Sequence, residues 1–214
     1  MTVQALRVLI VDDHPVVRTG LRSILGQSDV VVLVGEAGGV IEALAQAEQL
    51  EPDIVLTDLR LPDGSGLQII KALTQSRPLC RSLVLTTYVG DELVHSALEA
   101  GAVGFISKSY AEPELLCAIE AVAAGRRYFS ADVSAALVAF GPRVMLTVRE
   151  RAVLEALAEG LRNREIGKRL GMSEATARTH VERILDKFDC RDRGRAVAIA
   201  QQRGFFDCAP TGGS

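Results

Sequence analysis

Short apolar runs alternate with amphipathic stretches through the first 125 residues of the chain. The apolar runs are rich in Val, Ile and Leu and are short enough to be strands that are buried on both faces. The stretches between them repeat apolar residues at the spacing of a helix with one buried face. The apolar runs lie at 6–11, 31–36, 54–58, 82–86 and 103–106, and the helical patterns lie at 15–26, 39–50, 65–75, 91–100 and 113–124.

Five such strands alternating with five helices predict a flavodoxin-like α/β fold for residues 1–124. We expect a five-stranded parallel sheet in the order 2-1-3-4-5, counted along the chain, with helices on both faces. Ligands of such sheets bind outside the carboxyl ends of the strands. Functional side chains are therefore expected where the apolar runs end.

The last third of the chain has a purely helical pattern. Thr147 and Glu150 have the spacing of a capping box, which marks the start of a helix. Gly171 and Ser173 separate a short helix from a longer one, because glycine often ends a helix and serine often begins one. We expect residues 146–206 to form an all-α domain of four helices.

Residues 125–145 fit neither pattern, and we expect them to link the two domains. They contain a predicted short helix at 132–140, which the breakers Gly141 and Pro142 follow. The polar tail at 207–214 is expected to be frayed. A chain of 214 residues is long enough for two small domains, each with its own core.

The two parts of the chain carry opposite net charges. Residues 1–125 contain 8 Lys and Arg against 16 Asp and Glu, a net charge of −8, and residues 126–214 contain 16 against 11, a net charge of +5. Together these values give the −3 of the whole chain. A basic domain attracts polyanions such as nucleic acid, although two ordinary solvated surfaces would give the same counts.

The cysteines and the apolar segments indicate the compartment. The cysteines lack the spacing of metal sites and redox motifs, so we interpret them as free thiols in a reducing compartment. The first apolar run is too short for a signal peptide, and no stretch approaches the roughly 18 apolar residues of a membrane span. We therefore expect a cytoplasmic protein with no membrane partner. The cysteines are Cys80, Cys117, Cys190 and Cys208.

Acidic, hydroxyl and basic side chains stand where four of the apolar runs end. Asp12 and Asp13 close the first run, and Asp58 closes the third. Thr86 closes the fourth run, and Lys108 follows the fifth. Each of these residue types is often only a turn or surface residue when it stands alone. Parallel strands would bring all five to one rim of the sheet, which favours a shared function.

The chemistry of these side chains fits the transfer of a phosphoryl group to Asp58. A carboxylate is a weak nucleophile toward an anionic phosphoryl group, so the reaction needs cations. Asp12 and Asp13, with Asp58, supply the hard oxygen ligands that Mg²⁺ prefers. Lys108 can pair with Asp58 before the reaction and with a phosphoryl oxygen afterwards. The hydroxyl of Thr86 can contact the phosphoryl group only after transfer.

Four sequence motifs follow the predicted strands: DD at 12–13, DLRLPDGSG at 58–66, LTTY at 85–88 and GFISK at 104–108. Together they resemble the receiver domain of response regulators, over residues 5–124. The resemblance implies that Mg²⁺ is the cofactor and that a histidine kinase is the phosphodonor.

That resemblance assigns roles to individual residues. Asp58 is the phosphoacceptor, and the backbone carbonyl of Arg60 joins the acids around Mg²⁺. Thr86 is the switch hydroxyl, and Phe105 is the aromatic side chain that turns inward with it. Ser109 departs from the family pattern, because many receivers have proline after the lysine.

A short helix at 163–170, a turn and a longer amphipathic helix have the arrangement of a helix-turn-helix, whose second helix enters the major groove of DNA. The longer helix has an apolar face, which is typical of a core stripe. A plain helical bundle with a solvated charged face would show the same periodicity. The apolar residues are Ala177, Val181, Ile184, Leu185 and Phe188, and Arg178, Thr179, Glu182 and Arg183 lie opposite them.

Residues 146–200 have the sequence LTVRERAVLEALAEGLRNREIGKRLGMSEATARTHVERILDKFDCRDRGRAVAIA. This sequence resembles the LuxR-type DNA-binding domain of the NarL/FixJ response regulators. The resemblance implies that Arg178 and Thr179 face the bases of double-stranded DNA. It implies phosphate contacts for Thr176, His180 and Lys187.

Two residues and one helix of this domain each allow more than one role. Glu182 departs from the basic or small polar residue often found there, and an acid in the groove can accept a hydrogen bond from a cytosine amino group. His180 lies at the edge of the apolar stripe, where a packed interfacial histidine competes with a phosphate donor. The helix at 193–203 resembles the dimerising helix of the family, which implies a homodimer on inverted half-sites, whereas packing onto its own bundle is the alternative.

These observations predict a transcription regulator and not an enzyme. In this hypothesis, phosphorylation of Asp58 switches dimerisation and promoter binding. One alternative is an aspartyl-phosphate phosphohydrolase, although such enzymes typically carry a second acid where this chain has Arg60. The other alternative is a DNA-binding protein that acts without phosphate.

Overall fold

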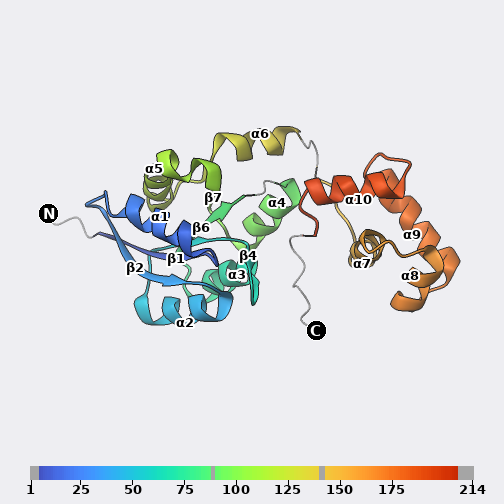
Figure 1. Cartoon of the computed structure of the whole chain (residues 1–214), viewed down its shortest axis with the longest axis horizontal. Coiled ribbons are helices and arrows are strands. Elements are labelled where there is room, and N and C mark those ends of the chain that lie inside the picture. The colour runs from blue at the N-terminus through green and yellow to red at the C-terminus, as the bar shows by residue number, and fades with distance from the viewer. Residues whose placement is uncertain (1–4, 88–89, 140–142, 207–214) are drawn as a thin grey trace.

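The computed structural model describes residues 5–87, 90–139 and 143–206 (Figure 1). A parallel sheet of six strands forms the middle layer of the N-terminal domain, in the order β2-β1-β3-β6-β7-β8. The strands are β1 (Leu6–Val11), β2 (Val31–Ala37), β3 (Ile54–Thr57), β6 (Arg81–Thr86), β7 (Gly104–Ser107) and β8 (Tyr128–Phe129).

Helices cover both faces of this sheet, with α1 and α5 on one face and α2, α3 and α4 on the other (Figure 1). Alternate residues of β1 enter different cores: Val8 and Ile10 pack with α1 and α5, whereas Leu9 and Val11 pack with α2 and α3. This explains why the run is apolar at every position. The helices are α1 (Pro15–Leu25), α2 (Val40–Leu50), α3 (Gly66–Ser76), α4 (Asp91–Ala100) and α5 (Ala111–Ala123).

The predicted order of the first five strands is confirmed, but the sheet has a sixth strand that the prediction lacks. In β8, Tyr128 pairs with Gly104 and Phe129 pairs with Phe105 of β7. The rings of Phe105 and Phe129 stack with centroids 6.2 Å apart. A strand of two residues leaves no periodic signal in a sequence, so the pattern of residues 125–145 predicts a linker with one short helix and no strand.

The helix predicted at 132–140 is present as α6 (Ala131–Ala139), and Val133 buries its side chain among residues of α4 and β7. The expected breakers Gly141 and Pro142 lie outside the described residues, as does the tail at 207–214. Part of the expected linker therefore packs onto the sheet domain. Two short strands, β4 (Arg60–Leu61) and β5 (Gly64–Ser65), form a hairpin before α3, and a 3-10 helix, η1 (Lys108–Tyr110), precedes α5.

The C-terminal domain contains the four expected helices. The predicted capping box is confirmed, because the amide of Thr147 donates to the carboxylate of Glu150 at 2.7 Å and the amide of Glu150 donates to the hydroxyl of Thr147 at 3.2 Å. Gly171 ends the second helix with a φ of 66°, in the left-handed region that favours glycine. The helices are α7 (Val148–Ala158), α8 (Asn163–Leu170), α9 (Glu174–Lys187) and α10 (Arg193–Gln202).

The apolar stripe predicted for α9 forms the core of this domain. Ala177, Val181 and Ile184 are buried against residues of α7, α8 and α10. The rings of Phe188 and Phe205 meet edge to face, with centroids 5.3 Å apart. Within the described residues, every helix is too short or too polar to cross a membrane.

Candidate functional site

Asp12, Asp58 and Lys108 meet at the carboxyl ends of β1, β3 and β7. The Nζ atom of Lys108 lies 2.5 Å from an Oδ2 atom of each carboxylate. Asp12 is fully buried, and Asp58 exposes 6% of its surface. Burial lowers the pKa of Lys108, but hydrogen bonds and attraction from Asp12 and Asp58 outweigh it and raise the pKa above its usual value. The ammonium group therefore stays charged between the two acids.

The carboxylate of Asp58 is held from two sides. Its Oδ1 atom accepts hydrogen bonds from the backbone amides of Leu59 at 2.6 Å and Arg60 at 3.2 Å. Its Oδ2 atom faces Lys108. The turn after Asp58 also comes very close to α3, because a Cβ atom at Gly66 would lie 2.1 Å from the backbone oxygen of Asp58. Glycine at this position lets the loop hold the carboxylate at the rim.

Asp12, Asp13 and His14 can bring ligand atoms within 4.8 Å of one another. Asp13 is exposed, and Nδ1 of His14 lies 2.6 Å from its Oδ1 atom. The oxygens of Asp12 and Asp13, beside Asp58, fit the hard-ligand preference of Mg²⁺. Arg60, whose carbonyl was expected to complete the set, lies in β4 just after Asp58. His14 is not among the predicted site residues, and in the sequence only its position beside the acid pair points to it.

The two expected switch residues lie on neighbouring strands. Thr86 ends β6, is 4% exposed and pairs in register with Ser107, which directly precedes Lys108. Phe105 is fully buried and stacks on Phe129 of β8. The ring of Phe105 thus already faces inward in this structure, and β8 holds it there.

The linker also contacts the strand that leads to Lys108. The amide of Ser107 donates to the hydroxyl of Ser130 at 3.3 Å, and that hydroxyl donates to Asp132 at 2.6 Å. Burial raises the pKa of Asp132, but hydrogen bonds from Ser130 and Ser107 outweigh burial and lower it. Asp132 lies in the first turn of α6. The first turn of α6 is therefore joined by hydrogen bonds to the residue next to Lys108.

The expected base-reading residues lie on the exposed side of α9. Arg178 and Glu182 form an ion pair of 3.3 Å one helical turn apart, and their side chains are 72% and 60% exposed. Thr176 and Thr179 are also exposed. Each makes a local hydrogen bond, Thr176 to the capping hydroxyl of Ser173 and Thr179 to a backbone carbonyl of its own helix. These side chains share one accessible surface of the C-terminal domain.

His180 and Lys187, which were also expected to contact DNA, make or approach contacts inside the domain. His180 is half-buried, and its Nδ1 atom is buried without a hydrogen-bond partner among the described residues. Lys187 donates to the carbonyl of Met145 at 2.8 Å and to Glu150 at 2.7 Å. Burial raises the pKa of Glu150, but Lys187 and Thr147 lower it to about 2. Lys187 thus joins α9 to the start of α7.

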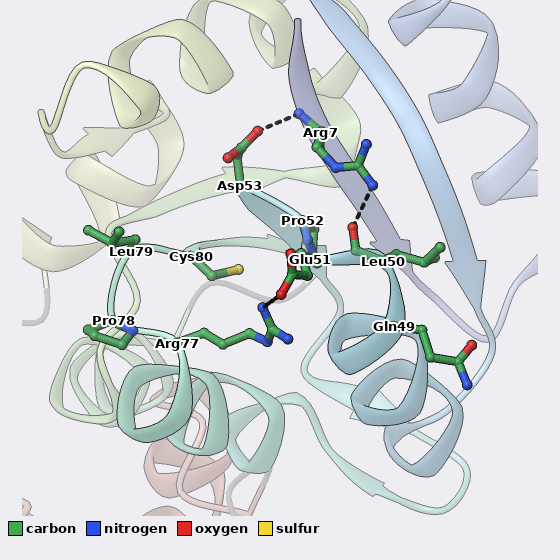
Figure 2. Close-up of a pocket in the computed structure, with 10 residues that line it drawn as sticks. All are labelled: Arg7, Gln49, Leu50, Glu51, Pro52, Asp53, Arg77, Pro78, Leu79 and Cys80. Atoms are coloured by element: carbon green, nitrogen blue, oxygen red, sulfur yellow. Dashed lines mark hydrogen bonds and ion pairs between the residues drawn. The ribbon is translucent and has the colours of Figure 1, made fainter. Parts of the chain in front are cut away.

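A cavity of about 610 Å³ lies at the amino ends of the central strands, beside the segments that precede β3 and β6 (Figure 2). Asp58 follows the carboxyl end of β3, at the opposite end of the strands. Both arginines that line the cavity already bind other groups of the chain. The guanidinium of Arg7 donates to the carbonyl of Leu50 at 2.7 Å, and Arg77 pairs with Glu51 at 3.2 Å. Burial raises the pKa of the Cys80 thiol to about 11, so this thiol stays protonated. The cavity is separate from the rim that holds the acids.

The chain is similar to known families in both of its domains. Residues 8–120 match the response regulator receiver domain, and residues 144–200 match the luxR family of bacterial regulatory proteins. It is 38% identical over 205 residues to the DNA-binding transcriptional activator DevR/DosR of Mycobacterium tuberculosis, covering 92% of this chain and 94% of that protein. It is 34% identical over 209 residues to the response regulator VraR of Staphylococcus aureus, covering 94% and 99%.

Solved structures of similar proteins agree with these matches. The complex of the two-component response regulator RcsB with DNA superposes with a TM-score of 0.71 at 26% identity, covering 93% of this chain and 99% of that one. The response regulator ChrA of a heme-sensing two-component system superposes with a TM-score of 0.54 at 36% identity, covering 94% and 98%.

Proposed function

Because this chain belongs to the NarL/LuxR family of DNA-binding response regulators, we propose that phosphorylation of Asp58 by a histidine kinase controls its dimerisation and its binding to promoter DNA. The observation that supports this most directly is the ammonium of Lys108 between Asp12 and Asp58. A buried acid pair with one shared cation is suited to receive a phosphoryl group and to compensate its charge.

Asp58 acts as the nucleophile in this proposal. One of its carboxylate oxygens attacks phosphorus, the P–N bond to the histidine of the kinase breaks, and the leaving imidazole keeps the electron pair. Asp12, Asp13, Asp58 and the backbone carbonyl of Arg60 would hold Mg²⁺, which supplies positive charge next to the transferring oxygens. Lys108 then exchanges its contact with Asp58 for one with a phosphoryl oxygen.

Thr86 carries the response to the rest of the domain. A phosphoryl group on Asp58 adds about two negative charges and strong hydrogen-bond acceptors. The hydroxyl of Thr86 donates to one of these oxygens, which draws the end of β6 toward Asp58. Since Phe105 is already buried against Phe129, the change falls on Thr86 at the end of β6.

The C-terminal domain binds double-stranded DNA in this proposal. α9 enters the major groove, where Arg178, Thr179 and Glu182 meet base edges, while Thr176 and His180 approach phosphates. Lys187 is held by Glu150 and contributes chiefly to the fold of the domain. A homodimer would read inverted half-sites through two copies of α9. The cytoplasm, where a bacterial regulator meets the genome, is the proposed site of action.

Replacing the phosphoacceptor tests this function. We expect Asp58→Ala to lose Mg²⁺-dependent labelling by a small acyl phosphate, together with the dimerisation and the gain in DNA affinity that labelling gives the wild type. Labelling, sedimentation and fluorescence anisotropy measure the three effects. Asp29→Ala, at an exposed acid after α1, serves as the control and should behave as the wild type.

The proposal is wrong if Asp58→Ala dimerises and binds DNA in the presence of the phosphodonor as the wild type does. Steady release of inorganic phosphate from small phosphate esters by the wild type would instead favour a phosphohydrolase.

A further inference from the structure

Three polar side chains connect the first turn of α6 to the end of β7. Ser107 is 4% exposed, Ser130 is 1% exposed, and Asp132 is half-buried beside them. Buried hydroxyl and carboxyl groups are costly unless they form hydrogen bonds. Ser130 and Asp132 lie beyond residue 120, where the match to the receiver domain ends, so that match assigns them no role.

The hydroxyl of Ser130 completes the hydrogen bonds at the edge of the sheet. The amide of Ser130 donates to the carbonyl of Phe105 at 3.0 Å, as in a continuation of β8. The next bond of such a parallel ladder would join the amide of Ser107 to the carbonyl of Ser130. That carbonyl instead accepts from the amide of Ser134 at 3.0 Å, in the first turn of α6. The hydroxyl of Ser130 takes its place and accepts from the amide of Ser107 at 3.3 Å.

Asp132 replaces Ser130 as a side-chain acceptor at the start of α6. A serine before a helix commonly accepts from an amide of the first turn. Here the Oδ1 atom of Asp132 accepts from the amide of Val133 at 2.9 Å and from the hydroxyl of Ser130 at 2.6 Å. The hydroxyl of Ser107 also donates to this carboxylate. The carboxylate therefore holds the hydroxyl of Ser130 in the direction that β7 requires.

These hydrogen bonds fix the backbone directly before Lys108. Ser107 is the last residue of β7 and pairs in register with Thr86 on the other side. Lys108 begins η1, and its Nζ atom lies 2.5 Å from Asp12 and from Asp58. A lysine side chain is a flexible point charge, so the place of its ammonium depends on where its backbone is held. A shift of the strand end would move the ammonium relative to the two acids.

We propose that Ser130 and Asp132 are positioning residues that hold Lys108 in place for phosphoryl transfer to Asp58. The inference rests on the proposed function and adds two residues of the segment between the domains to its chemistry. With an acyl phosphate as donor, a carboxylate oxygen of Asp58 attacks phosphorus, the P–O bond to the acyl group breaks, and the carboxylate of the donor leaves with the electron pair. Lys108 must then reach a transferred oxygen, and misplacement by about 1 Å can cost about 100-fold in rate.

The first test measures the rate of phosphorylation. We expect Ser130→Ala and Asp132→Ala to slow the labelling of Asp58 by acetyl phosphate about 10-fold at saturating Mg²⁺, within that limit. Ser134→Ala is the matched control, because this exposed serine lies one turn further along α6 and keeps the amide that binds Ser130. It should label at the wild-type rate. Folded Ser130→Ala and Asp132→Ala proteins that label as fast as the wild type would refute the positioning role. If Ser130→Ala does not fold, Asp132→Ala decides.

A double-mutant cycle tests whether the effect passes through Lys108. Removing the ammonium with Lys108→Ala should itself slow labelling. Adding Ser130→Ala to that variant should then change the rate by less than about twofold, because the group that the serine positions is gone. If Ser130→Ala costs the same factor with and without Lys108, the serine only stabilises the fold, and the inference is wrong.

The nuclear magnetic resonance signal of the Lys108 ammonium gives a third test, which needs no phosphoryl transfer. The chain has four lysines, so the ¹⁵N signals of their Nζ atoms can be assigned by substitution. Ser130→Ala and Asp132→Ala should shift the signal of Lys108 and leave that of Lys187, which binds Glu150 in the other domain. An unchanged Lys108 signal in both variants overturns the inference. A wild type that takes up no label refutes the proposed function, whereas the Nζ signal still judges the positioning.

Discussion

Lys187 shows that the role of one side chain depends on partners far away in the sequence. On α9 it stands among residues expected to contact DNA, yet its ammonium group binds Glu150, 37 residues earlier. Glu150 is 3% exposed and would be costly to bury as an unpaired charge. The capping-box motif predicts the position of Glu150 at the start of α7. No local sequence pattern predicts that Lys187 is its ion-pair partner. A lysine of α9 therefore contributes to the fold of its own domain.

This pair predicts a pH-dependent contribution to stability. The pKa of Glu150 is about 2 in the folded chain, against about 4.3 for an ordinary glutamate. Because the folded pKa is the lower one, the stabilisation is fully present above about pH 4.3 and is lost as the pH falls toward 2. We expect Glu150→Gln to cost about 1–3 kcal/mol at pH 7, and the difference from the wild type to shrink below pH 4.

Urea unfolding followed by circular dichroism from pH 7 to pH 3 measures this difference. Glu120→Gln, at an exposed glutamate of α5, is the control and should track the wild type throughout. A deficit of Glu150→Gln that stays constant across this range would count against the pair.

Among the elements, β8 has only two residues and yet completes the sheet beside β7. Tyr128 and Phe129 extend the sheet, and the ring of Phe129 stacks on Phe105, the proposed switch residue. The first five strands could be predicted because each is a run of apolar residues that recurs between helices. β8 could not, because two residues show no period and their pairing depends on tertiary contact with β7.

Removing the aromatic ring of Phe129 in β8 should destabilise the neighbouring strand, β7. We expect Phe129→Ala to lower the free energy of unfolding by about 2–4 kcal/mol, at or below the range for fully buried phenylalanine because this residue is half-buried. Thermal unfolding measures the loss, and amide exchange of β7 locates it. Val138→Ala, at an 82% exposed residue of α6, should change stability by less than about 0.5 kcal/mol. Equal melting of the two variants would show that the ring stack adds nothing.

At the scale of the whole molecule, the acidic site at the carboxyl ends of the strands could be predicted from the sequence. The contact between α4 and the C-terminal domain could not. Asp58 and Lys108 stand at the ends of strands, and parallel strands in one sheet bring such ends together. Arg143, Arg151 and Arg203 read in the sequence as ordinary surface cations of a basic domain. Their partners on α4 are 51, 59 and 112 residues away, and nothing local marks the pairing. Only the packing of the two domains reveals that Arg203 is buried and that Arg143 and Arg151 are half-buried.

The burial of these ion pairs predicts two different responses to salt. DNA binding by an exposed basic surface should weaken at least about tenfold between 50 and 200 mM salt, because counterions compete for phosphates. The largely buried ion pairs between α4 and these arginines are screened far less, so the radius of gyration of the chain should stay constant over the same range. Anisotropy and scattering on one salt series measure both responses. Expansion with salt would show that water and ions reach Arg203 and Asp91.

The sixth strand, β8, also determines where the receiver domain can be joined to another output domain. A chimera that takes residues 1–124 and attaches another output domain would leave β7 as the sheet edge and uncover one side of Phe105. Such an open edge invites pairing between copies of the hybrid protein. Grafting this receiver intact means carrying the chain through Ala139, so that its outermost strand and the helix behind it travel with the domain they complete.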